Sequence, residues 1–161
     1  MTVKPLLTLK NVTVQINTPS GVIQPVDDVC LSIAPGEIFA LVGESGCGKS
    51  MTALSINRLL PDNAQICEGS EIYLNDVPLH ELSEESMRKI REKRFGMIFQ
   101  DPATALNPVL TIGEQIFEAL IHGNGHEKSK KQIWQQVIEL LKQVRLPHAD
   151  WMLKQYLHQL S

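Results

Sequence analysis

The sequence has no long apolar run and no excess of positive charge. No window approaches the ~20 apolar residues of a membrane-spanning helix, and the apolar stretch within the first ten residues is too short for a signal peptide. The 15 lysines and arginines are outnumbered by 18 aspartates and glutamates, so the net charge is −3. We therefore expect a cytosolic chain that is not embedded in a membrane and has no nucleic-acid partner.

Cysteine is also scarce. Cys30, Cys47 and Cys67 form an odd set without the spacing of metal ligands, which suits a reducing compartment and argues against a disulfide framework. His122 and His126 lie in a glycine-rich segment, HGNGHEK, which we interpret as a loop and not as a metal site. The length of 161 residues and a hydrophobic share of 43% are typical of a globular domain of ordinary size.

The first half of the chain mixes strand and helix patterns. Apolar and polar residues alternate over 12–16 and over 29–33, which predicts two half-buried strands joined through a turn at Thr18–Gly21. Residues 38–42 are continuously apolar, as expected for a strand covered on both faces. A helix pattern follows from Lys49 to Leu60 and stops before a proline.

Later segments shift toward helix. We expect a strand over 71–79, a charged surface helix over 83–94 with Ser83 or Ser86 as its N-cap, and a short strand over 95–99. Beyond residue 107 the pattern is helical, with one apolar stripe at Ile112, Ile116, Phe117, Leu120 and Ile121 and another at Ile133, Val137, Leu140, Leu141 and Val144. The change near residue 100 is the best internal boundary and separates residues 1–100 from 101–161.

Residues 43–50, GESGCGKS, match the phosphate-loop pattern of glycine, four residues, then Gly-Lys-Ser. The match follows an apolar run and begins a helix pattern, as the chemistry requires. Phosphate oxygens must be met by several backbone N–H groups at once, and Gly43, Gly46 and Gly48 allow the chain to wrap closely around them. The N-terminus of the following helix adds partial positive charge and free N–H donors.

Two side chains of this loop suit a nucleoside triphosphate with magnesium. Lys49 can reach the β- and γ-phosphates, and the Ser50 hydroxyl can ligate Mg²⁺. Cys47 occupies a slot that needs only a small side chain, although a thiol near a lysine and a helix N-terminus can also be reactive. A phosphate loop alone leaves kinases, GTPases and many ATPases open.

The stretch that discriminates among these classes is MIFQDPATALNP at residues 97–108. Together with LVGESGCGKS and the final LHQLS, it resembles the ATP-binding subunits of ABC transporters, most of all the branch that serves dipeptide, oligopeptide and nickel importers. The resemblance runs from about residue 7 to residue 161. It implies an α/β fold: a P-loop NTPase core with an N-terminal antiparallel β subdomain over 1–100, then the Q-loop and the start of an α-helical subdomain over 101–161.

The resemblance also assigns roles to residues. Gln100 matches the Q-loop glutamine, which in the family contacts Mg²⁺ and the attacking water, and Ile16 stands where the family has an adenine-stacking aromatic. The resemblance implies that Lys49 and Gln100 are the catalytic residues and that Ser50 and Gln100 ligate Mg²⁺. It implies an ATP site formed by Gly43, Glu44, Ser45, Gly46, Cys47, Gly48, Lys49, Ser50 and Met51.

Partners and location are implied in the same way. The family's ATPase subunits lie on the cytoplasmic face of the membrane, contact permease subunits through the Q-loop and helical region, and pair with a second ATP-binding subunit. A solute-binding protein takes part indirectly. The intact subunit would hydrolyse ATP to energise the uptake of peptides or a related solute.

The chain ends at Leu160 and Ser161, where the family's signature motif begins. We therefore expect the front portion of a longer subunit, without the Walker B acids and the switch histidine, inactive or nearly so alone and with exposed strand edges. A shortened recombinant chain, a frameshift or an incomplete gene prediction would each explain this end. The alternative functions are a non-catalytic nucleotide-binding or regulatory module, and a smaller phosphate-loop enzyme with Asp101 as Mg²⁺ ligand.

Overall fold

A computed structural model of the chain describes residues 4–100, 105–124, 128–146 and 148–159. The chain divides into two compact units, Met1–Phe95 and Gly96–Ser161, and each has a hydrophobic core of its own.

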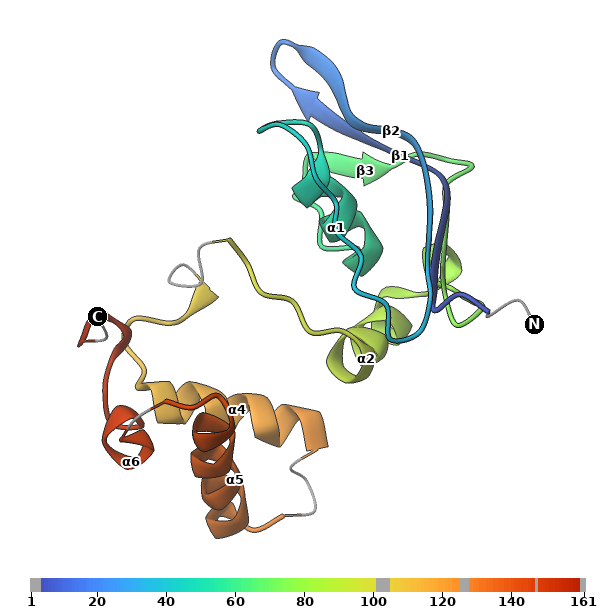
Figure 1. Ribbon diagram of the computed structural model, residues 1–161. Coiled ribbons are helices and arrows are strands. Elements are labelled where there is room, and N and C mark those ends of the chain that lie inside the picture. Colours follow the sequence, from blue (N-terminus) through green and yellow to red (C-terminus); the bar gives the residue numbers. More distant parts are fainter. Residues whose placement is uncertain (1–3, 101–104, 125–127, 147, 160–161) are drawn as a thin grey trace. The chain divides into compact units, whose positions relative to one another are not determined.

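The first unit is built on a five-stranded antiparallel sheet (Figure 1). The strands lie in the order β2-β1-β4-β5, and β3 pairs with β1 alongside the half that β4 leaves free. In chain order the elements are β1 (Leu7–Thr18), β2 (Gly21–Ile33), α1 (Lys49–Asn57), β3 (Ala64–Ile66), β4 (Glu71–Leu74), β5 (Val77–Pro78), the 3-10 helix η1 (Leu79–Glu81) and α2 (Glu84–Arg94).

The long hairpin of β1 and β2 confirms the two predicted strands and their turn. Thr18 pairs with Gly21 across the end of the hairpin, and the Thr18 hydroxyl donates a 2.6 Å hydrogen bond to the Gly21 carbonyl. Alternate residues of β1 face the core because side chains of a strand alternate between its two faces. The buried members of this core are Leu7, Leu9, Val12, Val14, Val26, Ile72, Leu79 and Met87.

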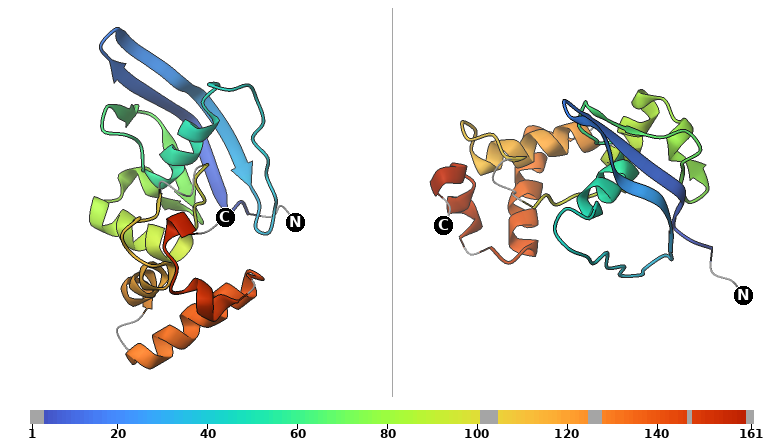
Figure 2. Two further views of the ribbon diagram at one scale, coloured as in Figure 1. Left: turned by 90° about the vertical axis from the view of Figure 1, so that its left-hand side faces the viewer. Right: turned by 90° about the horizontal axis from the view of Figure 1, so that it is seen from above.

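Two predicted strands are absent from the described residues. Segments 38–42 and 95–99 have no strand pairing, and the first runs as irregular chain between β2 and α1 (Figure 2). Ile38 is 97% exposed, Val42 85% and Ile98 93%. A strand exists only where its backbone N–H and C=O groups meet a neighbouring strand. No described residue supplies such a neighbour to either segment, so both predictions were wrong for this chain.

Helix α1 is shorter than predicted, and the reason lies in Arg58. This residue has a left-handed conformation, with φ of 51°, and its N–H bonds back to the carbonyls of Leu54 and Ser55. Its guanidinium group then donates to the carbonyls of Leu79 and Leu82, at 3.1 and 2.6 Å. The helix therefore ends at residue 57, because the following residue leaves the helical conformation to bind the η1 segment.

The predicted strand over 71–79 is a short hairpin instead. Asn75 and Asp76 both have positive φ, 47° and 65°, which is the geometry of a two-residue turn between antiparallel strands. In the next helix, α2, the Ser83 hydroxyl accepts a hydrogen bond from the Ser86 N–H at 3.3 Å. Ser83 is therefore the N-cap, and Ser86 lies within the first turn.

The second unit is helical, with α4 (Ile112–Asn124), α5 (Lys130–Gln143), α6 (Ala149–Met152) and a 3-10 helix, η3 (Leu157–Gln159). Its core joins Ile133, Val137 and Leu141 of α5 to Leu153, with apolar residues of α4 packed against them. The stripes were thus predicted correctly except at Leu140 and Val144, which are 39% and 65% exposed. Val144 lies just beyond the end of α5, where the helical spacing no longer applies.

Among the described residues, none of the helices has the length and apolar character that crossing a membrane requires.

Candidate nucleotide-binding site

The predicted phosphate loop links an irregular segment to the start of α1. Lys49, the first residue of the helix, folds back over the loop. Its Nζ donates hydrogen bonds to the carbonyl oxygens of Gly43 and Glu44, at 2.8 and 2.6 Å. The lysine ammonium therefore lies within the curve of the backbone, where the sequence predicted that it meets phosphate oxygens.

Gly48 holds this loop against the sheet. Its φ is +88°, and a Cβ added there would lie 1.9 Å from the carbonyl oxygen of Pro25 on β2. Any side chain would thus collide with the backbone of the hairpin. Gly46, in contrast, has φ of +85° with nothing within 4 Å of its Cβ position, so that part of the loop borders open space.

The contact with Pro25 was not predicted from the sequence. Pro25 lies 23 positions before Gly48, and no local pattern connects a residue of a predicted hairpin to a loop that follows it at such a distance. The support for the loop comes from the tertiary packing of β2, which reaches Gly48 through the Pro25 carbonyl and the Val26 side chain.

The N-terminus of α1 is left open by its own residues. The N-cap residue is Gly48, which has no side chain with which to bind the first N–H groups, and the first turn contains no acidic residue. Ser50 is exposed at the second helical position, with its hydroxyl accessible from solvent. Because the first N–H groups of a helix lack intrahelical partners, this end can receive an anion.

Cys47 closes one side of the loop. Its side chain is exposed, yet its Sγ lies 3.4 Å from Lys49 Nζ and would be 2.7 Å from a Cβ at Gly43. The thiol thus packs over the space that the absent Gly43 side chain leaves. This geometry agrees with the interpretation of a small residue that fits the slot.

Ile16 lies on β1, where it pairs with Ile23 of β2 and with Ala64 of β3. It is partly buried, and its partner Ile23 precedes by two positions the proline whose carbonyl faces Gly48. The hairpin therefore places Ile16 on the same pair of strands that supports the loop.

The remaining candidates lie in or beyond the second unit. Gln100 is exposed and belongs to the unit that begins at Gly96, so its predicted contact with Mg²⁺ and water stays a prediction. Asp101, His126, Leu160 and Ser161 lie outside the described residues. Over the described ranges, no group of three or more His, Cys, Asp and Glu residues could hold a metal ion.

Comparison with known proteins decides among the phosphate-loop classes. Residues 26–161 match the family described as "ABC transporter". This chain belongs to the ABC transporter family. The match includes the phosphate loop, Gln100 and the whole of the second unit, so the resemblance seen in the sequence is confirmed.

Relatives of this chain are named as ATP-binding proteins of peptide transport or import. The chain is 45% identical to a dipeptide transport ATP-binding protein, DppD, of Bacillus subtilis, over 97% of its own length and 46% of that protein. It is 42% identical to a putative peptide import ATP-binding protein of Brucella ovis, over its full length and 48% of that protein. The chain thus spans about half the length of the curated relatives that it matches.

Solved structures agree on the fold. A dimeric ATP-binding cassette, MJ0796, in a post-hydrolysis state bound to ADP and Pi, matches with a TM-score of 0.83 and 28% identity, over 96% of this chain and 63% of that one. A second dimeric structure of MJ0796, described as a bacterial ABC transporter cassette, matches with a TM-score of 0.82 and 28% identity, over 96% of this chain and 63% of that one. The α/β fold of an ABC ATPase, predicted from the sequence, is therefore confirmed.

Proposed function

We propose that this chain is the ATP-binding front portion of an importer ATPase that energises the uptake of peptides or a related solute. The observation that carries the proposal is the loop over residues 43–50, where Lys49 lies inside a curve of backbone at an uncapped helix N-terminus. Three positive features converge there: the ammonium group, the helix dipole and the free N–H groups.

ATP binding would exchange one set of partners for another. Lys49 would give up its bonds to the Gly43 and Glu44 carbonyls and donate to the β- and γ-phosphates. The first N–H groups of α1 would bind phosphate oxygens, Cys47 and Met51 would border them, and Ile16 would contact the adenine ring. Because both the donor and the acceptor are charged in an ammonium–phosphate bond, whereas only the donor is charged in the bonds to the carbonyls, the exchange favours the nucleotide.

Mg²⁺ fits the residues at hand. Ser50 is exposed in the first turn of α1, and its hydroxyl oxygen is a ligand type that Mg²⁺ accepts beside phosphate oxygens. Gln100 would provide a second oxygen and position water. When bound, Mg²⁺ neutralises charge on the phosphates as phosphoryl transfer proceeds.

The wider assembly is part of the proposal. We infer that the intact subunit works on the cytoplasmic face of the membrane, pairs with a second ATP-binding subunit and serves permease subunits and, through them, a solute-binding protein. Support comes from the names of the relatives and from the dimeric cassettes. In the second unit, Val144 and Trp151 are 65% and 58% exposed, as suits a helical region with a protein partner.

The 161-residue chain alone is proposed to bind ATP with little or no hydrolysis, so equilibrium binding is the appropriate test. A fluorescent ATP analogue should bind the chain, and Lys49→Ala should weaken binding roughly 100-fold, since a charged donor to phosphate is lost. Lys89→Ala is the matched control, because Lys89 is exposed on α2 and, among the described residues, forms an ion pair with Glu85 alone. If the original chain and the Lys49→Ala variant bind the ATP analogue equally well, the assignment of the nucleotide-binding site is refuted.

A further inference from the structure

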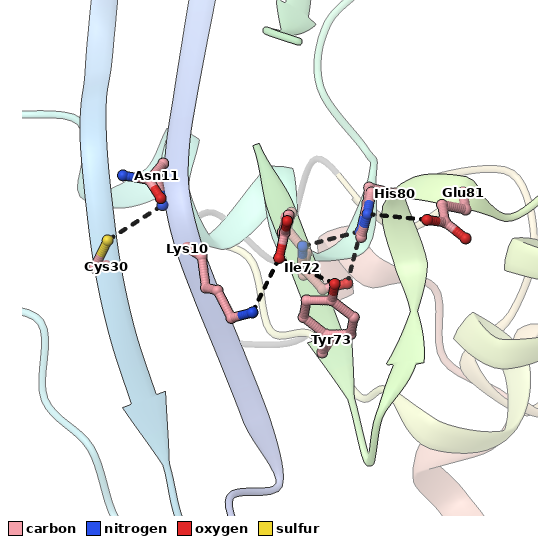
Figure 3. A network of polar contacts seen from close by, with 8 residues as sticks. Lys10, Asn11, Cys30, Ile72, Tyr73, His80 and Glu81 are labelled. Atoms are coloured by element: carbon pink, nitrogen blue, oxygen red, sulfur yellow. Dashed lines mark hydrogen bonds and ion pairs between the residues drawn. The ribbon is translucent and has the colours of Figure 1, made fainter. Parts of the chain in front are cut away.

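One unfilled strand position in the sheet of the first unit lies beside β3, away from the terminal strands β2 and β5. Strands β3 and β4 lie along the same edge of β1, with β3 opposite Val14–Ile16 and β4 opposite Leu7–Lys10. The outer side of β4 is occupied. Tyr73 and Leu74 pair with β5, and the Ile72 N–H donates to His80 Nδ1 at 3.1 Å, so the imidazole covers the end of that edge (Figure 3).

The outer side of β3 is different. The Cys67 N–H donates to the Thr13 carbonyl at 2.9 Å, and the Asn17 N–H donates to the Asn63 carbonyl at 2.8 Å. In an antiparallel ladder, residues that bond the partner strand alternate with residues whose backbone groups turn away. The N–H and C=O of Ala64 and Ile66 therefore point away from β1.

Of these outward groups, the Ala64 N–H is already used, because it donates to the Pro61 carbonyl at 2.8 Å. The Ile66 N–H and C=O have no hydrogen-bond partner among the residues that the structure describes. An open donor and acceptor pair on a sheet edge is a template for another strand.

A cleft of about 680 Å³ lies beside this edge. It is lined by every residue from Ala64 to Ser70, by the chain that follows α1 and, at its end, by His80. Consecutive residues of β3 and of the turn after it line the cleft. The cleft therefore runs alongside β3, where a further strand of the sheet would lie. β5 and His80 occupy the outer side of β4, and the cleft occupies the corresponding place on the outer side of β3. Apolar atoms of Leu60 and Ile66 contribute to its walls.

The charge around the cleft is acidic. Asp62 and Glu68 line it and are exposed, and neither forms an ion pair with another described residue. The one arginine of the lining, Arg58, directs its Nη1 to the Leu79 and Leu82 carbonyls. An occupant with basic side chains would therefore meet two uncompensated carboxylates.

We propose that this cleft binds an extended segment of a partner protein, which pairs with the Ile66 backbone as an added strand and carries basic side chains toward Asp62 and Glu68. This is strand addition at a sheet edge, in which main-chain hydrogen bonds supply affinity and side chains supply specificity. The site goes beyond the proposed ATPase function and uses none of the nucleotide-binding residues.

The test uses the 161-residue chain and a fluorescent, end-capped hexapeptide of alternating valine and lysine, followed by fluorescence anisotropy. Two further peptides are N-methylated, one on every valine and the other on every lysine, so that each lacks the N–H groups of one edge. An added strand can pair with β3 along only one of its own edges. The peptide methylated on the other edge should therefore bind about as well as the parent, and the peptide methylated on the pairing edge should bind at least about tenfold more weakly. A peptide with glutamate in place of lysine should also lose about tenfold.

A variant pair tests the protein side. Ile66→Pro removes the N–H that faces the cleft without removing a bond to β1, whereas Ile66→Val keeps it. We expect about tenfold weaker peptide binding for the proline variant, unchanged binding for the valine variant, and unchanged ATP-analogue binding for both. If the proline variant does not fold, a chain with Asp62→Asn and Glu68→Gln decides the question, because it lacks the two carboxylates of the cleft and should bind the lysine peptide about tenfold more weakly.

Four results would overturn the proposal. They are no binding of the parent peptide, equal binding of both methylated peptides and the parent, equal binding of the glutamate peptide, and a chain dimer that the parent peptide dissociates. The last result would make a second copy the occupant.

Discussion

The helices of this protein begin in two different ways. In α2 and α5 a serine side chain caps the first turn, with Ser83 accepting from Ser86 N–H and Ser129 accepting from Gln132 N–H. At the start of α4, the Glu114 carboxylate accepts from both the N–H and the hydroxyl of Thr111. Helix α1 begins at Gly48 with no side-chain cap and no acidic residue in its first turn.

The difference separates helices with a capped N-terminus from one whose N-terminus is open to the ligand that we propose. A side-chain cap uses the N–H groups that would otherwise receive an anion and adds negative charge when the cap is acidic. Helix α1 has neither a side-chain cap nor an acidic residue in its first turn. Like α5 it starts with a lysine, but the Ser129 side chain occupies the start of α5, whereas no side chain caps the start of α1. The caps stabilise their helices, whereas the N-terminus of α1 stays open to the phosphate that the proposed function requires.

Among changes to the helix caps, the largest effect should come from giving α1 the acidic residue that it lacks. Ser50→Asp places a carboxylate in the first turn, where it stabilises the helix but repels a triphosphate. Measured without Mg²⁺, so that loss of the metal ligand has no influence, affinity for the fluorescent ATP analogue should fall roughly 30-fold, as expected for about 2 kcal/mol of repulsion.

Ser50→Asn is the control for this variant, since asparagine has the same shape without the charge. It should bind the analogue within about threefold of the original chain, a difference below 1 kcal/mol. If the two variants bind equally, the charge at the start of α1 has no part in recognising the nucleotide.

A smaller effect should follow from uncapping α5. Ser129→Ala removes the hydroxyl that accepts from the Gln132 N–H and keeps only the bond from the backbone N–H of residue 129 to the Gln132 side chain. The free energy of unfolding of the helical unit should therefore fall by about 1 kcal/mol. Both tryptophans of the chain, Trp134 and Trp151, lie in this unit, so fluorescence during urea unfolding reports on it alone. Gln135→Ala, an exposed change within the same helix, should leave the transition unchanged.

The smallest effect should be the change of stability with pH that the Glu114 carboxylate causes at the start of α4. Hydrogen bonds from the Thr111 N–H, and then from its hydroxyl, lower the pKa of Glu114 below its ordinary value of 4.5. A lowered folded-state pKa means that the charged carboxylate stabilises the folded state above the unfolded pKa. This stabilisation is lost as the pH falls through the pKa that Glu114 has in the folded state.

Comparison with Glu114→Gln isolates this contribution. The original chain should melt at a higher temperature than the variant near pH 6, and the difference should shrink as the pH falls below about 4. A difference that stays constant from pH 6 to pH 3 would show that the carboxylate charge plays no part in the cap.

Local patterns predicted much of this fold. The β1–β2 turn at Thr18–Gly21, the Ser83 cap and the buried face of α5 depend on residues close together in the chain, so short windows contain the needed information. Predictions failed where a distant partner decides. Residues 38–42 are apolar enough for a buried strand, yet they are exposed because no described strand pairs with them.

The candidate site shows the same division. Its residue types and spacing were predicted from GESGCGKS, because a phosphate loop is a local structure of consecutive residues. The contact of Gly48 with the Pro25 carbonyl was not predicted, since it joins segments that only the packing of β2 brings together. The role of Gln100 remains a prediction, carried by the family resemblance.

The sequence by itself determined the family, the phosphate loop and the amphipathic helices, because each depends on residue types at fixed short spacings. Only the tertiary structure decided that α1 ends at Arg58, that the loop rests on the backbone of β2, and that β3 keeps an open edge beside an acidic cleft. These features depend on hydrogen bonds and close contacts between residues far apart in the chain, which no pattern of neighbouring residues encodes.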